Sequence, residues 1–200
     1  LPRPERRAQL LDAAQGVFVE QGYHAAAMDE IAVRAGVSKP VLYQHFPRKQ
    51  DLYLALLDQH SAELEECVTS ALKSAKSNKE RVLATIAAYY DFVAREGAPF
   101  RLLFESDLAN EPAVGERLEG MFNRLADFVA KAIADDSHLS PEAAKLVGMA
   151  LTGMAQVSAR HWINQEVALD QDEAAAFIGQ LAWRGIAGFP AHAAQPGAPA

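Results

Sequence analysis

Two short helices joined by a sharp turn, within residues 28–49, constrain this chain more than any other feature. The stretch reads MDEIAVRAGVSKPVLYQHFPRK, and its first helix is predicted from about Asp29 to Ala35. Gly36 follows at the position after a helix end, where a positive φ is cheap only for glycine. Ser38 can cap the next helix by accepting a hydrogen bond from an exposed N–H. Pro40 suits that helix's first turn, where a missing N–H costs nothing.

The apolar residues of both helices fall on single faces. Those predicted to turn inward are Ile31, Ala32, Ala35, Val41, Leu42 and Phe46, which leaves Lys39, Tyr43, Gln44 and His45 to point outward. Helices this short cannot stand alone, so a third helix, predicted over residues 4–21, must pack behind them. This is the layout of a helix-turn-helix, whose second helix enters the DNA major groove. The same geometry also occurs in helical bundles that have no role with nucleic acids.

The outward side chains suit contact with DNA. Lys39 places a cation at the start of the second helix, nearest the base edges, and Gln44 can hydrogen-bond a base or a phosphate. Tyr43 and His45 offer polar tips on planar rings, and Lys49 opens the next helix as a candidate phosphate partner. We therefore expect a surface that combines base readout with contacts to the DNA backbone.

From about Arg6 to Leu57 the chain resembles the N-terminal domain of the TetR family of transcriptional repressors. The motifs that carry the resemblance are Gly22-Tyr23, Ile31-Ala32, Ala35-Gly36-Val37-Ser38, Leu42-Tyr43-Gln44-His45-Phe46, Lys49 and Leu52. The resemblance implies an all-α homodimer with a DNA-reading domain at the N-terminus. It also implies a larger helical domain that binds a small molecule and thereby releases a palindromic DNA operator.

The resemblance also assigns roles to single residues. It implies that Tyr43 and Lys49 touch phosphates, and that the start of the recognition helix, Ser38 to Pro40, reads bases. The chain departs from the family where many members carry threonine or serine before the second helix, because Ala26-Ala27-Met28 stands there. We therefore expect that helix to lack a side-chain cap, with a backbone N–H at Met28 meeting the phosphate instead.

The charge of the chain is unevenly distributed. Residues 1–50 carry seven Lys and Arg against five Asp and Glu, a net charge of +2. The remaining residues carry a net charge of −9, which brings the whole chain to −7. A positive head on an acidic body orients the molecule toward a polyanion. The contrast supports a DNA partner for the N-terminal part of the chain.

Composition excludes several classes of protein. Half of the residues are hydrophobic, which is too many for a disordered chain, and no apolar run reaches the length of a membrane helix. The start lacks the apolar segment of a signal peptide. The single cysteine, Cys67, cannot form an internal disulfide, so we expect a cytoplasmic protein that does not meet a membrane. Residues 135–138, Asp-Asp-Ser-His, are read as a solvated loop, and we expect neither a metal nor a cofactor.

The whole chain is predicted to be all-α, with about nine helices. After the three near the N-terminus, periodic apolar residues place helices at about 48–75, 79–95, 100–108, 113–134, 140–164 and 170–188. We divide the chain into a helix-turn-helix DNA-binding domain (4–49), a helical ligand-binding and dimerisation domain (50–189) and a disordered tail (190–200).

The second domain is predicted to hold a small-molecule effector and to form the dimer. Candidate ligand contacts are Tyr89, Phe100, Arg101, Phe104, Phe122 and Trp162, a set that suits an apolar or aromatic compound. Aromatic residues at helical spacing are also ordinary core residues. The last two helices are apolar over more than one face, so we expect a second copy to cover Met154, Val157, Phe177, Ile178 and Leu181.

Two classes of function compete. The first is a ligand-responsive DNA-binding regulator, a repressor by the resemblance. The second is a helical small-molecule-binding protein or enzyme with no DNA role. No recognisable catalytic motif, glycine-rich phosphate loop or metal-ligand spacing occurs in the sequence. The sequence therefore favours the regulator and predicts no catalytic residues.

Overall fold

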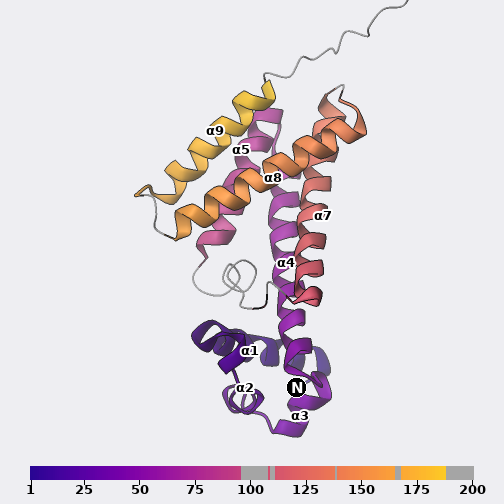
Figure 1. Cartoon of the computed structure of the whole chain (residues 1–200), viewed down its shortest axis with the longest axis vertical. Helices are drawn as coiled ribbons and strands as arrows, with labels where there is room; N and C mark the ends of the chain where they lie inside the picture. Colours follow the sequence, from indigo (N-terminus) through magenta and orange to yellow (C-terminus); the bar gives the residue numbers. More distant parts are fainter. Residues whose placement is uncertain (96–107, 109–110, 138, 165–167, 188–200) are drawn as a thin grey trace, which may run out of the picture. The chain divides into compact units, whose positions relative to one another are not determined.

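The computed structural model describes residues 1–95, 108, 111–137, 139–164 and 168–187, which form eight helices and no strand. The helices are α1 (Arg3–Ala25), α2 (Met28–Arg34), α3 (Lys39–His45), α4 (Lys49–Ser74), α5 (Asn78–Ala94), α7 (Pro112–Asp136), α8 (Pro141–Ile163) and α9 (Gln171–Ala187) (Figure 1). The predicted all-α class is confirmed. The helix predicted at 100–108 lies, except for Leu108, outside the described residues, and so does the predicted tail.

The ends of the helices follow from local sequence. Ser140 Oγ accepts a hydrogen bond from the N–H of Ala143 at 3.2 Å, and so caps α8 as its Ser-Pro-Glu start predicts. Asp170 Oδ1 accepts from the N–H of Glu173 at 2.8 Å and caps α9 in the same way. The first helix, predicted over residues 4–21, continues past Gly22. Gly22 adopts φ +77° and interrupts the helical backbone there, and one further turn follows to the end of α1.

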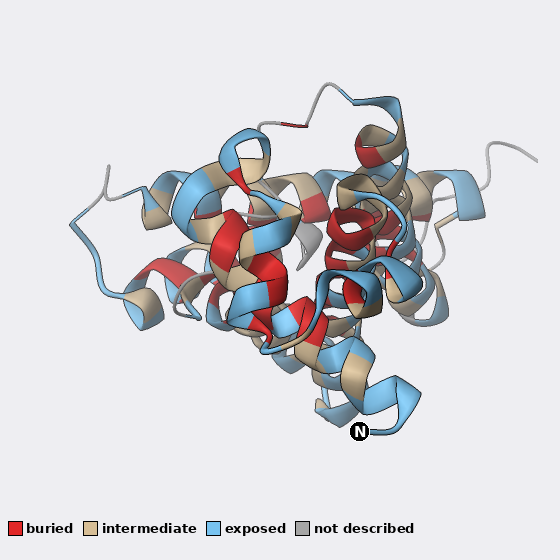
Figure 2. Ribbon diagram, turned by 90° about the horizontal axis from the view of Figure 1, so that it is seen from below, coloured by how far each residue is buried: buried red, intermediate tan, exposed pale blue. Residues whose placement is uncertain are grey.

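The described residues divide into two compact units, which are considered separately. The first comprises Leu1–Glu63 and Arg95–Gly120, and the second comprises Leu64–Ala94 and Met121–Ala200. Buried and exposed residues fall on different faces of the helices (Figure 2). The functional division predicted at residue 49 stays a prediction.

Aromatic side chains hold α1 to α4 in the first unit. The ring of Tyr53, in α4, lies 5.3 Å from the rings of both Phe18 and Tyr23, edge-on to each. Edge-to-face rings at this separation attract each other beyond the effect of their burial. Farther along α4, buried His60 bonds to Gln15 of α1 at 2.9 Å and to Glu63 at 3.0 Å, so this histidine is satisfied inside the protein.

Close approach between helices shapes the second unit, where α5 packs against α8 and α9. A Cβ added to Gly148 of α8 would lie 2.5 Å from the backbone oxygen of Ala126 in α7. A Cβ on Gly179 of α9 would lie 2.8 Å from Leu83 Cδ2 of α5. Small residues thus let these backbones come near one another. Among the described residues, no helix combines the length and apolarity that crossing a bilayer requires.

We predict that Gly148→Ala lowers the free energy of unfolding by about 1–3 kcal/mol, because the new methyl group meets a backbone oxygen that cannot move aside. Gly185→Ala is the matched control in α9, since nothing lies within 4 Å of a Cβ there. It should leave stability unchanged or slightly raised. Urea denaturation of the three proteins measures this, and equal midpoints for the two variants would contradict the packing of α8 on α7.

Candidate DNA-binding surface

The turn between α2 and α3 sets the direction of α3. Gly36 adopts φ +64°, as predicted, and a side chain would be strained at that angle. The N–H of Val37 donates to the oxygen of Ala32, and that of Gly36 to the oxygen of Val33, both at 3.0 Å. These bonds satisfy the last carbonyls of α2 and let the chain enter α3 within a few residues.

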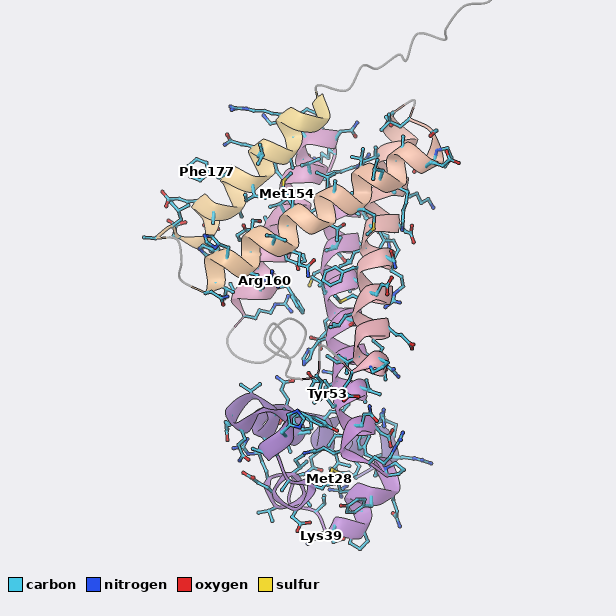
Figure 3. All side chains as sticks on the ribbon, viewed as in Figure 1. Met28, Lys39, Tyr53, Met154, Arg160 and Phe177 are labelled. Carbon is cyan, nitrogen blue, oxygen red and sulfur yellow. The ribbon has the colours of Figure 1, made fainter. Side chains whose placement is uncertain are left out.

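α3 buries one face and exposes the other. Leu42 and Phe46 are buried, and the guanidinium of Arg7 lies 4.4 Å from the centre of the Phe46 ring. Of the six predicted DNA contacts in α3 and at its start, five are exposed, namely Ser38, Lys39, Pro40, Tyr43 and Gln44, and His45 is half-buried. The outward orientation predicted for Lys39, Tyr43 and Gln44 is therefore confirmed, and Lys39 is labelled in Figure 3. Contact between these side chains and DNA stays a prediction.

Ser38 does not cap α3 in the way that the sequence suggests. It occupies the N-cap position, but its side chain makes no capping hydrogen bond, so that prediction was wrong. A capping oxygen accepts from the second or third helical N–H, and here the second helical residue is Pro40, which has none. The Ser38 carbonyl accepts from Val41 and Leu42 instead, at 3.0 and 3.2 Å. The hydroxyl-bearing residue remains exposed at the start of α3.

Lys39 is paired within the protein. Its ammonium forms an ion pair with the carboxylate of Asp29, in the first turn of α2, and both side chains are more than half exposed. Exposed pairs of this kind contribute roughly 0–1 kcal/mol, so the pair can open at little cost when a stronger acceptor arrives. Sequence reasoning did not find this partner, because the crossing of two helices brings together residues that no motif links.

Lys49 has a structural role that the sequence did not predict. Its ammonium donates to the backbone oxygens of Tyr23, His24 and Ala26, at 2.7, 3.2 and 2.8 Å. It also lies 4.5 Å from the centre of the Tyr23 ring. Partial burial lowers the pKa of this ammonium. The three acceptors lie around the end of α1 at Ala25, where the last carbonyls of a helix have no helical partners.

This arrangement bears on the phosphate contact predicted for Lys49. An ammonium has three N–H donors, and the three backbone oxygens use them all. A phosphate contact requires the ammonium to exchange at least one of these acceptors for the phosphate. The contact stays a prediction, while the bracing of the end of α1 against the start of α4 is observed.

The start of α2 matches the prediction of a missing cap. Ala27 stands at the N-cap position and offers no side-chain acceptor, and Met28, the first helical residue, is half-buried. Asp29 and Glu30 in the first turn complement the helix dipole. Contact between a backbone N–H at Met28 and a phosphate stays a prediction.

The predicted ligand zone is described only in part. Tyr89 is buried in α5, Phe122 in α7 is half-buried, and Trp162 in α8 is half-buried and donates to the oxygen of Leu169 at 2.9 Å. The three other predicted contacts, Phe100, Arg101 and Phe104, lie outside the described residues. Within the described part of the chain, no group of three or more His, Cys, Asp or Glu is arranged to hold a metal ion.

Large apolar side chains are exposed along α8 and α9. Of the predicted interface residues, Val157, Phe177 and Leu181 are 57%, 61% and 58% exposed, while Met154 and Ile178 are half-buried (Figure 3). Sequence reasoning missed Leu146 and Met149, two further exposed residues of α8. Residues 146, 149, 153 and 157 share one side of a helix. The spacing of Leu146 and Met149 from Val157 could therefore have predicted that they belong to the same exposed surface.

Comparisons with known proteins agree with this geometry. The sequence model of the bacterial regulatory proteins of the tetR family matches residues 10–56. The HTH-type transcriptional activator FasR of Mycolicibacterium smegmatis is 44% identical over 190 residues, which is 95% of this chain and 87% of that protein. A fatty acid metabolism regulator protein of Bacillus subtilis is 27% identical over 129 residues, or 62% of this chain and 66% of that protein.

The fold agrees as well. The crystal structure of a TetR-like transcriptional regulator from Rhodococcus sp. RHA1 superposes with a TM-score of 0.74 and 28% identity, over 94% of this chain and 100% of that one. The chain is thus a helix-turn-helix transcriptional regulator. It belongs to the TetR family.

We predict that Lys49→Met lowers the free energy of unfolding by about 1–3 kcal/mol, because three backbone oxygens at the end of α1 lose a charged donor. Lys131→Met, an exposed position of α7, is the control and should change stability little. Urea denaturation without DNA separates the two roles of Lys49. A Lys49→Met protein as stable as the control, but weak in DNA binding, would contradict the structural role.

Proposed function

We propose that the chain binds double-stranded DNA in a sequence-specific manner, with α3 in the major groove. The exposed face of α3 supports this, because it carries the cation of Lys39, the phenol of Tyr43 and the amide of Gln44. Buried Leu42 and Phe46 hold the opposite side of the helix in place. In this proposal Lys39 leaves Asp29 to contact a base, and Tyr43 contacts a phosphate. Ser38, Pro40, Gln44, His45 and Met28 complete the surface.

We further propose that two copies bind together. The exposed apolar residues of α8 and α9 support an interface formed by the same patch on both copies. Two copies present two α3 helices to successive major grooves, so the operator is expected to be a near-palindrome with half-sites about one helical turn apart. Residues 50–189 are thereby assigned to ligand binding and dimerisation, and residues 4–49 to DNA.

For the effector we propose a fatty acid or its acyl thioester. The relative from Bacillus subtilis, named a fatty acid metabolism regulator, supports this class, and so does the apolar character of the predicted ligand zone. The dimer would have two conformations that differ in the distance between its two α3 helices. The ligand changes the affinity for DNA only if it binds one of these conformations more tightly than the other. The predicted repression stays a prediction, because the relative from Mycolicibacterium smegmatis is named an activator.

The competing class is a helical enzyme or carrier with no DNA role. The related proteins are named as regulators, which supports a protein without catalytic residues. A regulator of chromosomal operators in a bacterium works in the cytoplasm, and that is where we propose this chain acts.

The proposal is tested first by selecting bound fragments from a random pool of DNA, with the operator then varied one base pair at a time. Lys39→Ala should flatten the preference at one position of each half-site, with a cost of about 1–3 kcal/mol there. Tyr43→Phe should weaken binding to every operator variant by the same factor, because a backbone contact carries no sequence information. A preference profile that Lys39→Ala leaves unchanged, or a pool without enrichment, would refute the assignment of α3.

The second test addresses the dimer. Leu181→Glu places a charge within the proposed interface, so sedimentation should show monomers and binding to the full operator should fall sharply. Lys131→Glu, at an exposed position of α7, adds a negative charge outside the proposed interface and should remain dimeric. A Leu181→Glu protein that stays dimeric at the wild-type concentration would show that another surface joins the two copies.

A further inference from the structure

Two buried hydroxyl oxygens of α5 have no hydrogen-bond partner among the described residues. They are Thr85 Oγ1 and Tyr89 OH, which stand four residues apart. Tyr89 is only 3% exposed. Its neighbour Tyr90 differs, because its hydroxyl donates to Ser158 Oγ at 2.9 Å. Buried polar groups are paired in most proteins, and each exception calls for a cause.

The two hydroxyls share one side of α5. A helix turns by about 100° per residue, so residues four apart lie one above the other. The side of α5 that faces α8 and α9 is a different one. It carries Leu83, which lies against Gly179 of α9, and Tyr90, which bonds to α8. At about 100° per residue, Tyr89 lies about a third of a turn from Leu83, and Thr85 lies nearly on the opposite side of the helix from Leu83.

Both groups can donate a hydrogen bond. Burial raises the pKa of the Tyr89 phenol far above its ordinary value, against the opposing charge of Arg160, so the phenol keeps its proton. A threonine hydroxyl also carries one donor, and it rotates to suit its acceptor. Fully buried Phe92 lies on the same side of α5 and adds an apolar wall. The side thus combines two donors with an apolar neighbour.

We propose that Thr85 and Tyr89 form the polar end of the effector site and donate hydrogen bonds to the carbonyl oxygen of an apolar acyl ligand. This inference rests on the proposed function, which supplies the acyl effector. A carbonyl oxygen has two lone pairs, so one ligand atom can accept from both hydroxyls. An unpaired buried donor costs free energy until a ligand pairs with it, so the site should favour a ligand that carries the acceptor over an analogue without it.

The test uses two ligands that differ in one group. Palmitoyl-CoA carries the thioester carbonyl, and its thioether analogue hexadecyl-CoA has a methylene in its place. The wild-type protein should bind palmitoyl-CoA about tenfold more tightly in calorimetry, the effect of a net hydrogen-bond contribution near the usual value. Tyr89→Phe and Thr85→Val remove only the hydroxyl character. Each should reduce this preference, and together they should abolish it.

Thermal unfolding without ligand supplies a second readout. Tyr89→Phe should leave the melting temperature equal or raised, because it removes an unpaired buried hydroxyl. Tyr90→Phe is the matched control, since it breaks an existing bond to Ser158 and should lower the melting temperature. A fall for Tyr89→Phe as large as that for Tyr90→Phe would show that the Tyr89 hydroxyl is already paired in the free protein, and would overturn the inference.

The ligand results separate this inference from the function beneath it. Equal affinity of the wild-type protein for the two ligands, or a preference that survives in the double variant, overturns the role of the hydroxyls and leaves the acyl effector standing. Failure of the wild-type protein to bind either ligand overturns the acyl effector itself. A preference that is present in the wild-type protein and absent in the double variant supports both.

Discussion

The DNA-binding surface depends on the packing of two helices that are too short to be stable alone. α2 and α3 have seven residues each, and isolated helices shorter than about 12–15 residues are marginal in water. They persist because residues such as Ile31, Leu42 and Phe46 are buried against the rest of the first unit. Because one face of α3 is buried in this way, the direction of the exposed face is fixed. Side chains that recognise base edges need such a fixed direction.

Local sequence was enough to predict most of the fold. Apolar periodicity placed each described helix to within a few residues, and Ser140, Asp170 and Gly36 act at helix ends as their chemistry predicts. These features depend on residues within one or two turns of each other. The outward direction of Lys39, Tyr43 and Gln44 followed from the same periodicity. Leu42 lies on the buried face of the helix, and these three residues lie on the exposed part.

The contacts that sequence reasoning missed join residues far apart in the chain. Lys49 meets carbonyls 23–26 positions before it, and Lys39 meets Asp29 across the turn. No periodic pattern encodes such pairs, which depend on how helices cross. Ser38 makes no capping bond, because Pro40 lacks the N–H of the second helical residue and the N–H of the third, Val41, bonds to the Ser38 carbonyl. The unpaired hydroxyls of α5 likewise emerge only when burial and partners are known.

The account rests on the presence of α3 in the major groove, which is tested most directly by cleavage of operator DNA from α3 itself. An iron chelator would be attached to Gln44→Cys in a protein that also carries Cys67→Ser, so that the label has a single site. Cleavage is expected in two clusters, symmetric about the operator centre and about one helical turn apart. Cleavage spread evenly along the duplex, or identical to that from a label at Lys131→Cys, would contradict the account.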